Sequence, residues 1–173
     1  MKRIKLQTTK EVITITNENL LALYEKYSNS VFRLALSYTH SVQDAEDITQ
    51  AVFMKLIEKC PHFLPDKEKA WLTKVTVNTC KDLLKSHWKQ KYDALDEISE
   101  NVIWDMTPKE YDVFHAVMNL PIKYRIVVHL HYYEGYSFRE IANILKITTS
   151  AVSMRLHRAR EILKNTLSRE DFI

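Results

Sequence analysis

The chain has 173 residues, 46% of them hydrophobic and 27% charged, and its net charge at pH 7 is +3. This length accommodates one ordinary domain or two small ones, each with its own modest hydrophobic core. A single glycine in the whole chain excludes the glycine-rich phosphate loops of nucleotide-dependent enzymes, which need two or three glycines at fixed spacing. The weak positive charge indicates no class of partner, so only its distribution along the chain is informative.

The cysteines and the start of the chain indicate a cytoplasmic protein. Cys60 and Cys80 have no CxxC spacing and no secretory context, which favours two reduced thiols over a disulfide. Three basic residues near the start resemble a signal peptide, but polar residues follow them directly. No stretch approaches the apolar length that crosses a membrane. Residues 1–16 show no helical pattern and are interpreted as an N-terminal extension.

The first two expected helices follow this extension. Apolar residues recur at intervals of three and four over residues 20–38, which is the period of one helix face. The Ser41–Asp44 stretch has the spacing of a capping box, in which a hydroxyl and an acid satisfy unpaired amides. A second helix should therefore run over residues 42–59.

The third helix is expected after a loop. Pro61 and Pro65 disfavour helical conformation before them and mark a loop over residues 60–68, with a helix starting near Asp66. Residues 73–79 alternate like a strand, and their β-branched side chains also favour sheets. A helix is preferred because a lone strand would lack a partner, and because one stripe fits a helix: Leu72, Val75, Thr79 and Leu83.

A shift in charge marks the expected boundary between two domains. Residues 93–112 contain seven acids and only one base, Lys109. Such an acidic composition is typical of a linker, and we place that linker at residues 93–107. The acids of this segment are Asp93, Asp96, Glu97, Glu100, Asp105, Glu110 and Asp112. The sequence from Thr107 to Glu110 then combines an N-cap, a first-turn proline and an N3 acid, so a second helical domain begins there.

The end of the chain predicts a helix-turn-helix. Gly135 can end a helix in a left-handed conformation, and Ser137–Glu140 forms another capping box before a short apolar helix. Residues 146–148 make the turn, and a longer helix should run over residues 149–167. The buried stripe of that helix is expected to be Val152, Leu156, Ala159 and Leu163.

The opposite face of the last helix is basic and polar, as a major-groove reader requires. Residues 146–169 contain one acid, Glu161, against Lys146, Arg155, Arg158, Arg160, Lys164 and Arg169. Such a bias suits a polyanion. A solvated face on a core helix would show the same pattern, so charge alone leaves both interpretations open.

Two groups of residues together carry a family resemblance. The first comprises Leu120-Pro121, Arg125, Glu134-Gly135-Tyr136-Ser137, Glu140-Ile141-Ala142 and Val152 through Arg160. The second comprises Asp44 through Gln50, Val52-Phe53, Ala70-Trp71-Leu72, Asn78 and Asp82. Both resemble the extracytoplasmic-function (ECF) sigma factors, sigma subunits of RNA polymerase in the sigma-70 family. The two groups occur in the family's order, which makes their joint signal specific.

The resemblance implies an all-α fold of two small helical domains. A sigma-2-like bundle over residues 17–92 would bind core polymerase and recognise and melt the downstream promoter element. A sigma-4-like helix-turn-helix domain over residues 108–170 would bind the upstream element, with the acidic linker between them. The implied partners are core RNA polymerase, through its β′ coiled coil and β flap, promoter DNA and an anti-sigma factor, without membrane insertion.

The resemblance also selects site residues. Those for polymerase binding are Asp44, Asp47, Gln50 and Phe53. Those for the downstream element are Trp71, Lys74, Asn78, Lys81 and Lys85, and those for the upstream element are Thr149, Ser150, Ser153, Arg155, His157 and Arg158. Simpler roles stay open, because first-turn acids complement a helix dipole and a tryptophan often packs in a core.

Three other functions compete with this interpretation. The cysteines and the seven histidines form no constellation with catalytic spacing, so we expect no catalytic residues and no cofactor. His129 and His131 lie two apart and would face different directions on a helix, so no metal site is expected. A helix-turn-helix regulator acting without polymerase remains the alternative, and the helix with Asp44 and Phe53 distinguishes the two.

Overall fold

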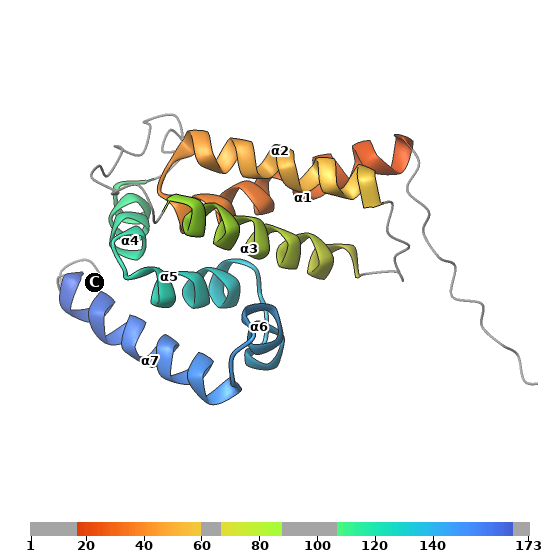
Figure 1. The fold of residues 1–173 in the computed structure, drawn as a ribbon. Helices are drawn as coiled ribbons and strands as arrows, with labels where there is room; N and C mark the ends of the chain where they lie inside the picture. Colours follow the sequence, from red (N-terminus) through yellow and green to blue (C-terminus); the bar gives the residue numbers. More distant parts are fainter. Residues whose placement is uncertain (1–16, 60–66, 88–106, 168–173) are drawn as a thin grey trace, which may run out of the picture.

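Every regular element of the computed structural model is helical in the part of the chain that it describes, residues 17–59, 67–87 and 107–167 (Figure 1). The all-α prediction is therefore confirmed. The expected linker at residues 93–107 lies almost entirely outside the described residues. In chain order the elements are α1 (Asn17–Thr39), α2 (Val42–Lys59), α3 (Glu68–His87), α4 (Pro108–Met118), α5 (Ile122–Val128), the π-helix η2 (His129–Tyr133), α6 (Phe138–Leu145) and α7 (Thr149–Thr166).

The N-terminal half is a three-helix bundle in which α1 contacts both α2 and α3. His40 ends α1 in the left-handed region, at φ 59°, and turns the chain back into α2. The Ser41 hydroxyl accepts the Asp44 amide at 3.2 Å, as the capping pattern predicts. The buried stripe of α2 faces α1 and α3, with Ala45, Ile48, Val52 and Leu56 in the core.

Residues 73–79 are helical, as predicted, in spite of their β-branched side chains. Each threonine of this stretch donates its hydroxyl to the carbonyl four residues earlier: Thr73 to Lys69, Thr76 to Leu72 and Thr79 to Val75. These bonds satisfy hydroxyls that would otherwise be buried without a partner, as Thr76 would be. The helix therefore accommodates residues that favour strands in isolation.

The C-terminal half begins and turns at the positions that capping predicts. Thr107 and Glu110 form a complete capping box at α4, and Ser137 and Glu140 form another at α6. Gly135 has a φ of +74°, where a side chain would be strained. The π-helix η2 was not predicted; its widened turn joins the Glu134 amide to the His129 carbonyl at 3.1 Å.

The Ser137 cap offers a direct test of this local physics. We expect Ser137→Ala to lower the free energy of unfolding by about 1 kcal/mol, because the Glu140 amide loses its acceptor. Urea denaturation of the full chain measures the change. The exposed Ser150 is a control, since Ser150→Ala should stay within about 0.5 kcal/mol. Equal losses in the two variants would contradict the capping role.

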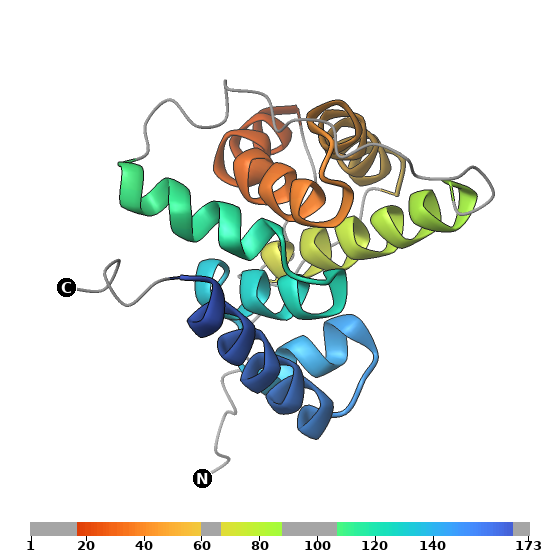
Figure 2. The ribbon, with the colours of Figure 1, turned by 90° about the vertical axis from the view of Figure 1, so that its left-hand side faces the viewer.

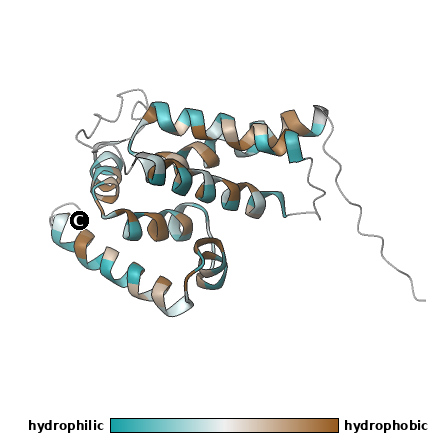
Figure 3. Ribbon diagram, viewed as in Figure 1, coloured by the Kyte–Doolittle hydropathy of each residue, from teal (hydrophilic) through white to brown (hydrophobic). Residues whose placement is uncertain are grey.

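The two halves pack against each other (Figure 2). Helix α5 contacts α1, and α6 contacts α3, so the apolar faces form one continuous core rather than two separate ones (Figure 3). This core runs from Val31 and Leu34 in α1 to Val152 and Leu156 in α7. The sequence did not place the two halves relative to each other, because periodicity reports which face of a helix is buried but not which neighbour covers it.

Candidate polymerase and DNA surfaces

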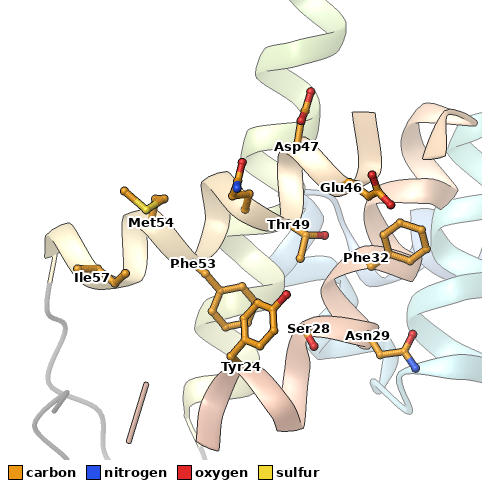
Figure 4. A pocket seen from close by; sticks show the side chains of 11 residues that line it. Tyr24, Ser28, Asn29, Phe32, Glu46, Asp47, Thr49, Phe53, Met54 and Ile57 are labelled. Carbon is orange, nitrogen blue, oxygen red and sulfur yellow. The ribbon is translucent and has the colours of Figure 1, made fainter. Parts of the chain in front are cut away.

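A groove lies between α1 and α2 on the surface of the N-terminal half (Figure 4). The Tyr24 and Phe53 rings meet edge to face near its middle, with their centroids 4.9 Å apart. Helix α1 contributes Tyr24, Ser28, Asn29 and Phe32, and α2 contributes Glu46, Asp47, Thr49, Gln50, Phe53, Met54 and Ile57.

The groove has an acidic end and an apolar end. Glu46 and Asp47 lie toward one end, whereas Met54 and Ile57 lie toward the other (Figure 4). Met54 is 50% exposed and Ile57 is 43% exposed, and apolar side chains grouped in this way on a surface mark an interaction site. A partner with basic residues beside an apolar ridge would complement both ends.

Three of the four residues selected for polymerase binding line this groove: Asp47, Gln50 and Phe53. Asp44 is half-buried at the start of α2, outside the lining, where its amide is capped by Ser41.

The sequence interpretation missed the apolar lining of the groove. A signal for it exists, because Asp47, Gln50, Met54 and Ile57 follow each other at intervals of three and four. They therefore form a second stripe on α2, beside the buried one.

The residues selected for the downstream promoter element share one face of α3. Lys74, Asn78 and Lys85 are exposed, whereas Trp71 is half-buried and packs against the core. Lys81 is half-buried and donates to the Leu145 carbonyl of α6 at 3.5 Å. Burial lowers the pKa of Lys81, as do the neighbouring charges of Lys85 and Arg155.

Helices α6 and α7 form the predicted helix-turn-helix. Lys146 ends α6 in the left-handed region, at φ 60°, and the Ile147 amide donates to the Ala142 carbonyl at 3.1 Å. The Thr148 hydroxyl caps α7 by accepting the Ala151 amide. Val152, Leu156 and Ala159 are buried, which leaves the other face of α7 free to enter a groove of DNA.

Most of the residues selected for the upstream element lie on that outer face. Thr149, Ser150, Ser153, His157 and Arg158 are exposed, whereas Arg155 is half-buried. Glu161 binds Arg158 at 2.9 Å and lies 3.5 Å from His157 Nε2. Exposed pairs of this kind contribute little to stability, so both side chains can be recruited by DNA phosphates or bases.

The described residues contain no cluster of side chains suited to a metal. No group of three or more His, Cys, Asp or Glu side chains is placed there to hold a metal ion. Cys80 is an unpaired buried thiol whose pKa is raised by burial to about 12, so it is protonated at neutral pH. None of the helices described is long and apolar enough to span a membrane.

Two family models match the chain, one in each half. The model of Sigma-70 region 2 matches residues 23–90, and the model of Sigma-70 region 4 matches residues 112–163. The first covers the α1–α2 groove and the α3 face, and the second covers the helix-turn-helix.

Curated relatives agree with both models. The RNA polymerase sigma factor SigV of Bacillus subtilis is 28% identical over 171 residues, covering 96% of this chain and 98% of that protein. The ECF RNA polymerase sigma factor SigE of Mycolicibacterium smegmatis is 27% identical over 157 residues. That match covers 85% of this chain but only 61% of SigE, so the chain spans less than two thirds of this relative.

Solved structures share the fold. The sigma factor RpoE of Bartonella quintana, solved with the anti-sigma factor NepR, has a TM-score of 0.70 at 18% identity, covering 86% of this chain and 96% of RpoE. CnrH, solved with the cytosolic domain of CnrY, has a TM-score of 0.62 at 21% identity, covering 87% and 88%. With region 2, region 4 and its helix-turn-helix in place, the chain belongs to the ECF sigma factors of the sigma-70 family, which are not enzymes.

Proposed function

We propose that this sigma factor directs core RNA polymerase to specific promoters and assists DNA opening during initiation, acting in the cytoplasm. Residues 17–92 would bind core polymerase and the downstream element, and residues 108–170 would bind the upstream element. Residues 93–107 would connect them. The observation that carries the proposal is one chain with a groove between α1 and α2, acidic at one end and apolar at the other, and a separate helix-turn-helix.

The groove supplies the polymerase contact in this proposal. Asp47 and Glu46 would meet basic residues of the β′ coiled coil. At the apolar end of the groove, Met54 and Ile57 would be buried against the partner and lose contact with water. Apolar groups buried at the centre of an interface contribute most of its affinity, whereas charges at the rim guide association. A regulator acting on DNA alone has no need of this groove.

The two DNA surfaces have different tasks. On α3, Lys74, Lys81 and Lys85 would hold phosphates, while Asn78 and Trp71 would contact bases exposed by strand opening. On α7, Arg158 is the strongest candidate for reading a base edge, because a guanidinium forms paired hydrogen bonds with guanine. The β flap of polymerase would contact the C-terminal half at the same time.

We also propose regulation by an anti-sigma factor. RpoE of Bartonella quintana was solved in complex with one, and its fold matches most of this chain. An inhibitor that covers the α1–α2 groove would compete directly with polymerase, because exposed apolar surface there suits either partner.

Co-purification of the full chain with bacterial core polymerase, followed by run-off transcription from the promoter region of its own operon, tests the function. Stable association with promoter-dependent transcripts is expected. DNA binding without polymerase association would instead favour the helix-turn-helix regulator.

Within this function, Arg158→Ala should weaken binding of the upstream element by roughly tenfold, because a base or phosphate contact is lost. Core polymerase affinity should stay unchanged, since Arg158 lies far from the groove in sequence and on the outer face of α7. Holoenzyme binding to upstream-element duplex, measured by anisotropy, gives the comparison. Lys109→Ala removes the same charge at an exposed position of α4, outside the helix-turn-helix, and should have a smaller effect; equal effects of both would reject the assignment.

A further inference from the structure

Polar contacts fasten the two halves of the chain together. Thr73 of α3 and Tyr136 share a hydrogen bond of 2.9 Å, and Lys81 donates to the Leu145 carbonyl. The densest group of contacts surrounds Glu134, whose side chain is only 7% exposed. We call Ser30, Lys69, His129 and Glu134 the Glu134 cluster.

Glu134 is paired with both neighbouring helices of the N-terminal half. Ser30 of α1 donates to Glu134 Oε1 at 2.7 Å, and Lys69 of α3 lies 3.1 Å from Oε2. Lys69 also donates to the Glu134 carbonyl at 2.8 Å. Burial alone would raise the pKa of the carboxyl, but contacts with His129, Ser30 and Lys69 lower it to about 2. The carboxylate is thus ionised at neutral pH and held by both helices.

His129 links the same carboxylate to α1. Ser37 donates its only hydroxyl hydrogen to the Arg33 carbonyl at 2.8 Å, so its oxygen accepts a hydrogen bond from His129 Nδ1 at 3.0 Å. The other ring nitrogen, Nε2, lies 3.6 Å from Glu134 Oε1. All four members are therefore held in one arrangement across the boundary between the halves.

This packing places two residues that are proposed to contact DNA against each other. Lys81 of the downstream-element face donates to Leu145, and Arg155 of the upstream-element helix is close enough to lower the pKa of Lys81. Both side chains are half-buried at the boundary. Lys81 and Arg155 cannot serve two separate promoter elements while they face each other there.

We propose that the Glu134 cluster is an autoinhibitory latch, which holds the C-terminal half on α1 and α3 and must open before α3 and α7 can each bind DNA. The DNA-binding part of this inference rests on the function proposed above. A buried carboxylate suits a latch, because removing a partner leaves a buried group unpaired and shifts the population toward separated halves.

The latch can be opened from either side. Glu134→Gln removes the charge from the C-terminal half, and Lys69→Met removes its partner from the N-terminal half. Small-angle X-ray scattering of the full chain should show a larger radius of gyration for both variants. Anisotropy with promoter duplex should show about tenfold tighter binding for both, the effect of a 1.4 kcal/mol shift toward the open state.

The two variants separate a latch from simple electrostatics. Glu134→Gln makes the chain more positive and Lys69→Met makes it less positive, so charge alone would tighten DNA binding in the first and weaken it in the second. Asp112→Asn, at an exposed position of α4, makes the same charge change as Glu134→Gln without touching the cluster. Circular dichroism checks that each variant retains its helices, and Ser30→Ala provides a milder opening if Glu134→Gln does not fold.

Expansion and tighter DNA binding in both latch variants, without either effect in Asp112→Asn, would support the proposal. Unchanged scattering would overturn the latch, and expansion without tighter binding would overturn its inhibitory role. If no variant binds promoter DNA even with core polymerase, the proposed function fails, and scattering alone then decides whether the latch exists.

Discussion

Arg125→Ala is expected to lower the free energy of unfolding by about 3–5 kcal/mol, the largest effect on stability of any single substitution proposed for this chain. The Arg125 side chain lies between the two halves, where the residue is only 6% exposed. Its guanidinium donates from Nε to the Ser37 carbonyl and from Nη1 to the carbonyls of Met118 and Leu120. Alanine would leave all three carbonyls without this donor.

The position of these carbonyls explains how a buried positive charge is stabilised between the halves. Ser37 lies in the last turn of α1, and Met118 is the last residue of α4, so both carbonyls belong to the negative ends of helix dipoles. Burial lowers the pKa of Arg125 to about 10, which still leaves it protonated at neutral pH. One side chain therefore neutralises two helix ends from different halves.

Urea denaturation of the full chain measures the loss, and two variants interpret it. Arg125→Lys keeps the charge, but lysine lacks the planar guanidinium whose donors reach several carbonyls at once. The variant should therefore recover only part of the stability. Arg139→Ala removes an exposed arginine of α6 and should change stability by less than about 0.5 kcal/mol. A loss below about 1 kcal/mol for Arg125→Ala would show that water replaces the guanidinium.

Local signals predicted the helices well. The cap at Ser41 and the loop marked by Pro61 and Pro65 gave α2 its observed bounds, and the two capping boxes placed the starts of α4 and α6. These signals work because unpaired backbone amides at a helix start are satisfied by residues within three positions. The π-helix η2 was missed, because nothing in its local sequence distinguishes a widened turn from an α-helix.

The contacts between the halves could not be predicted in the same way. Ser30 and Glu134 are 104 positions apart, and Lys69 and Glu134 are 65 apart, so no periodic pattern connects them. Each residue alone is an ordinary polar residue on a helix or loop. The candidate site shows the same limit: resemblance identified Asp47, Gln50 and Phe53 on α2, whereas Tyr24 joins the groove only because α1 folds against it.

Met54→Glu should weaken binding of core polymerase by about 2 kcal/mol, or roughly thirtyfold, because it places a charge on the apolar side of the α1–α2 groove. The fold should tolerate the change, since Met54 is half exposed and lies outside the buried stripe of α2. Affinity for labelled core polymerase measures the effect, and the melting temperature checks the fold.

The same substitution at Met154 provides a matched control. Met154 is 61% exposed on α7, on the face proposed to contact DNA, so Met154→Glu adds an equal charge at a similar exposure in the other half. It should impair binding of the upstream element, through repulsion of phosphates, and leave core polymerase affinity unchanged. If Met54→Glu binds polymerase as well as the unaltered chain does, the groove is not the main contact. Polymerase would then have to be held by the C-terminal half, and the division of tasks between regions 2 and 4 would need to be reassigned.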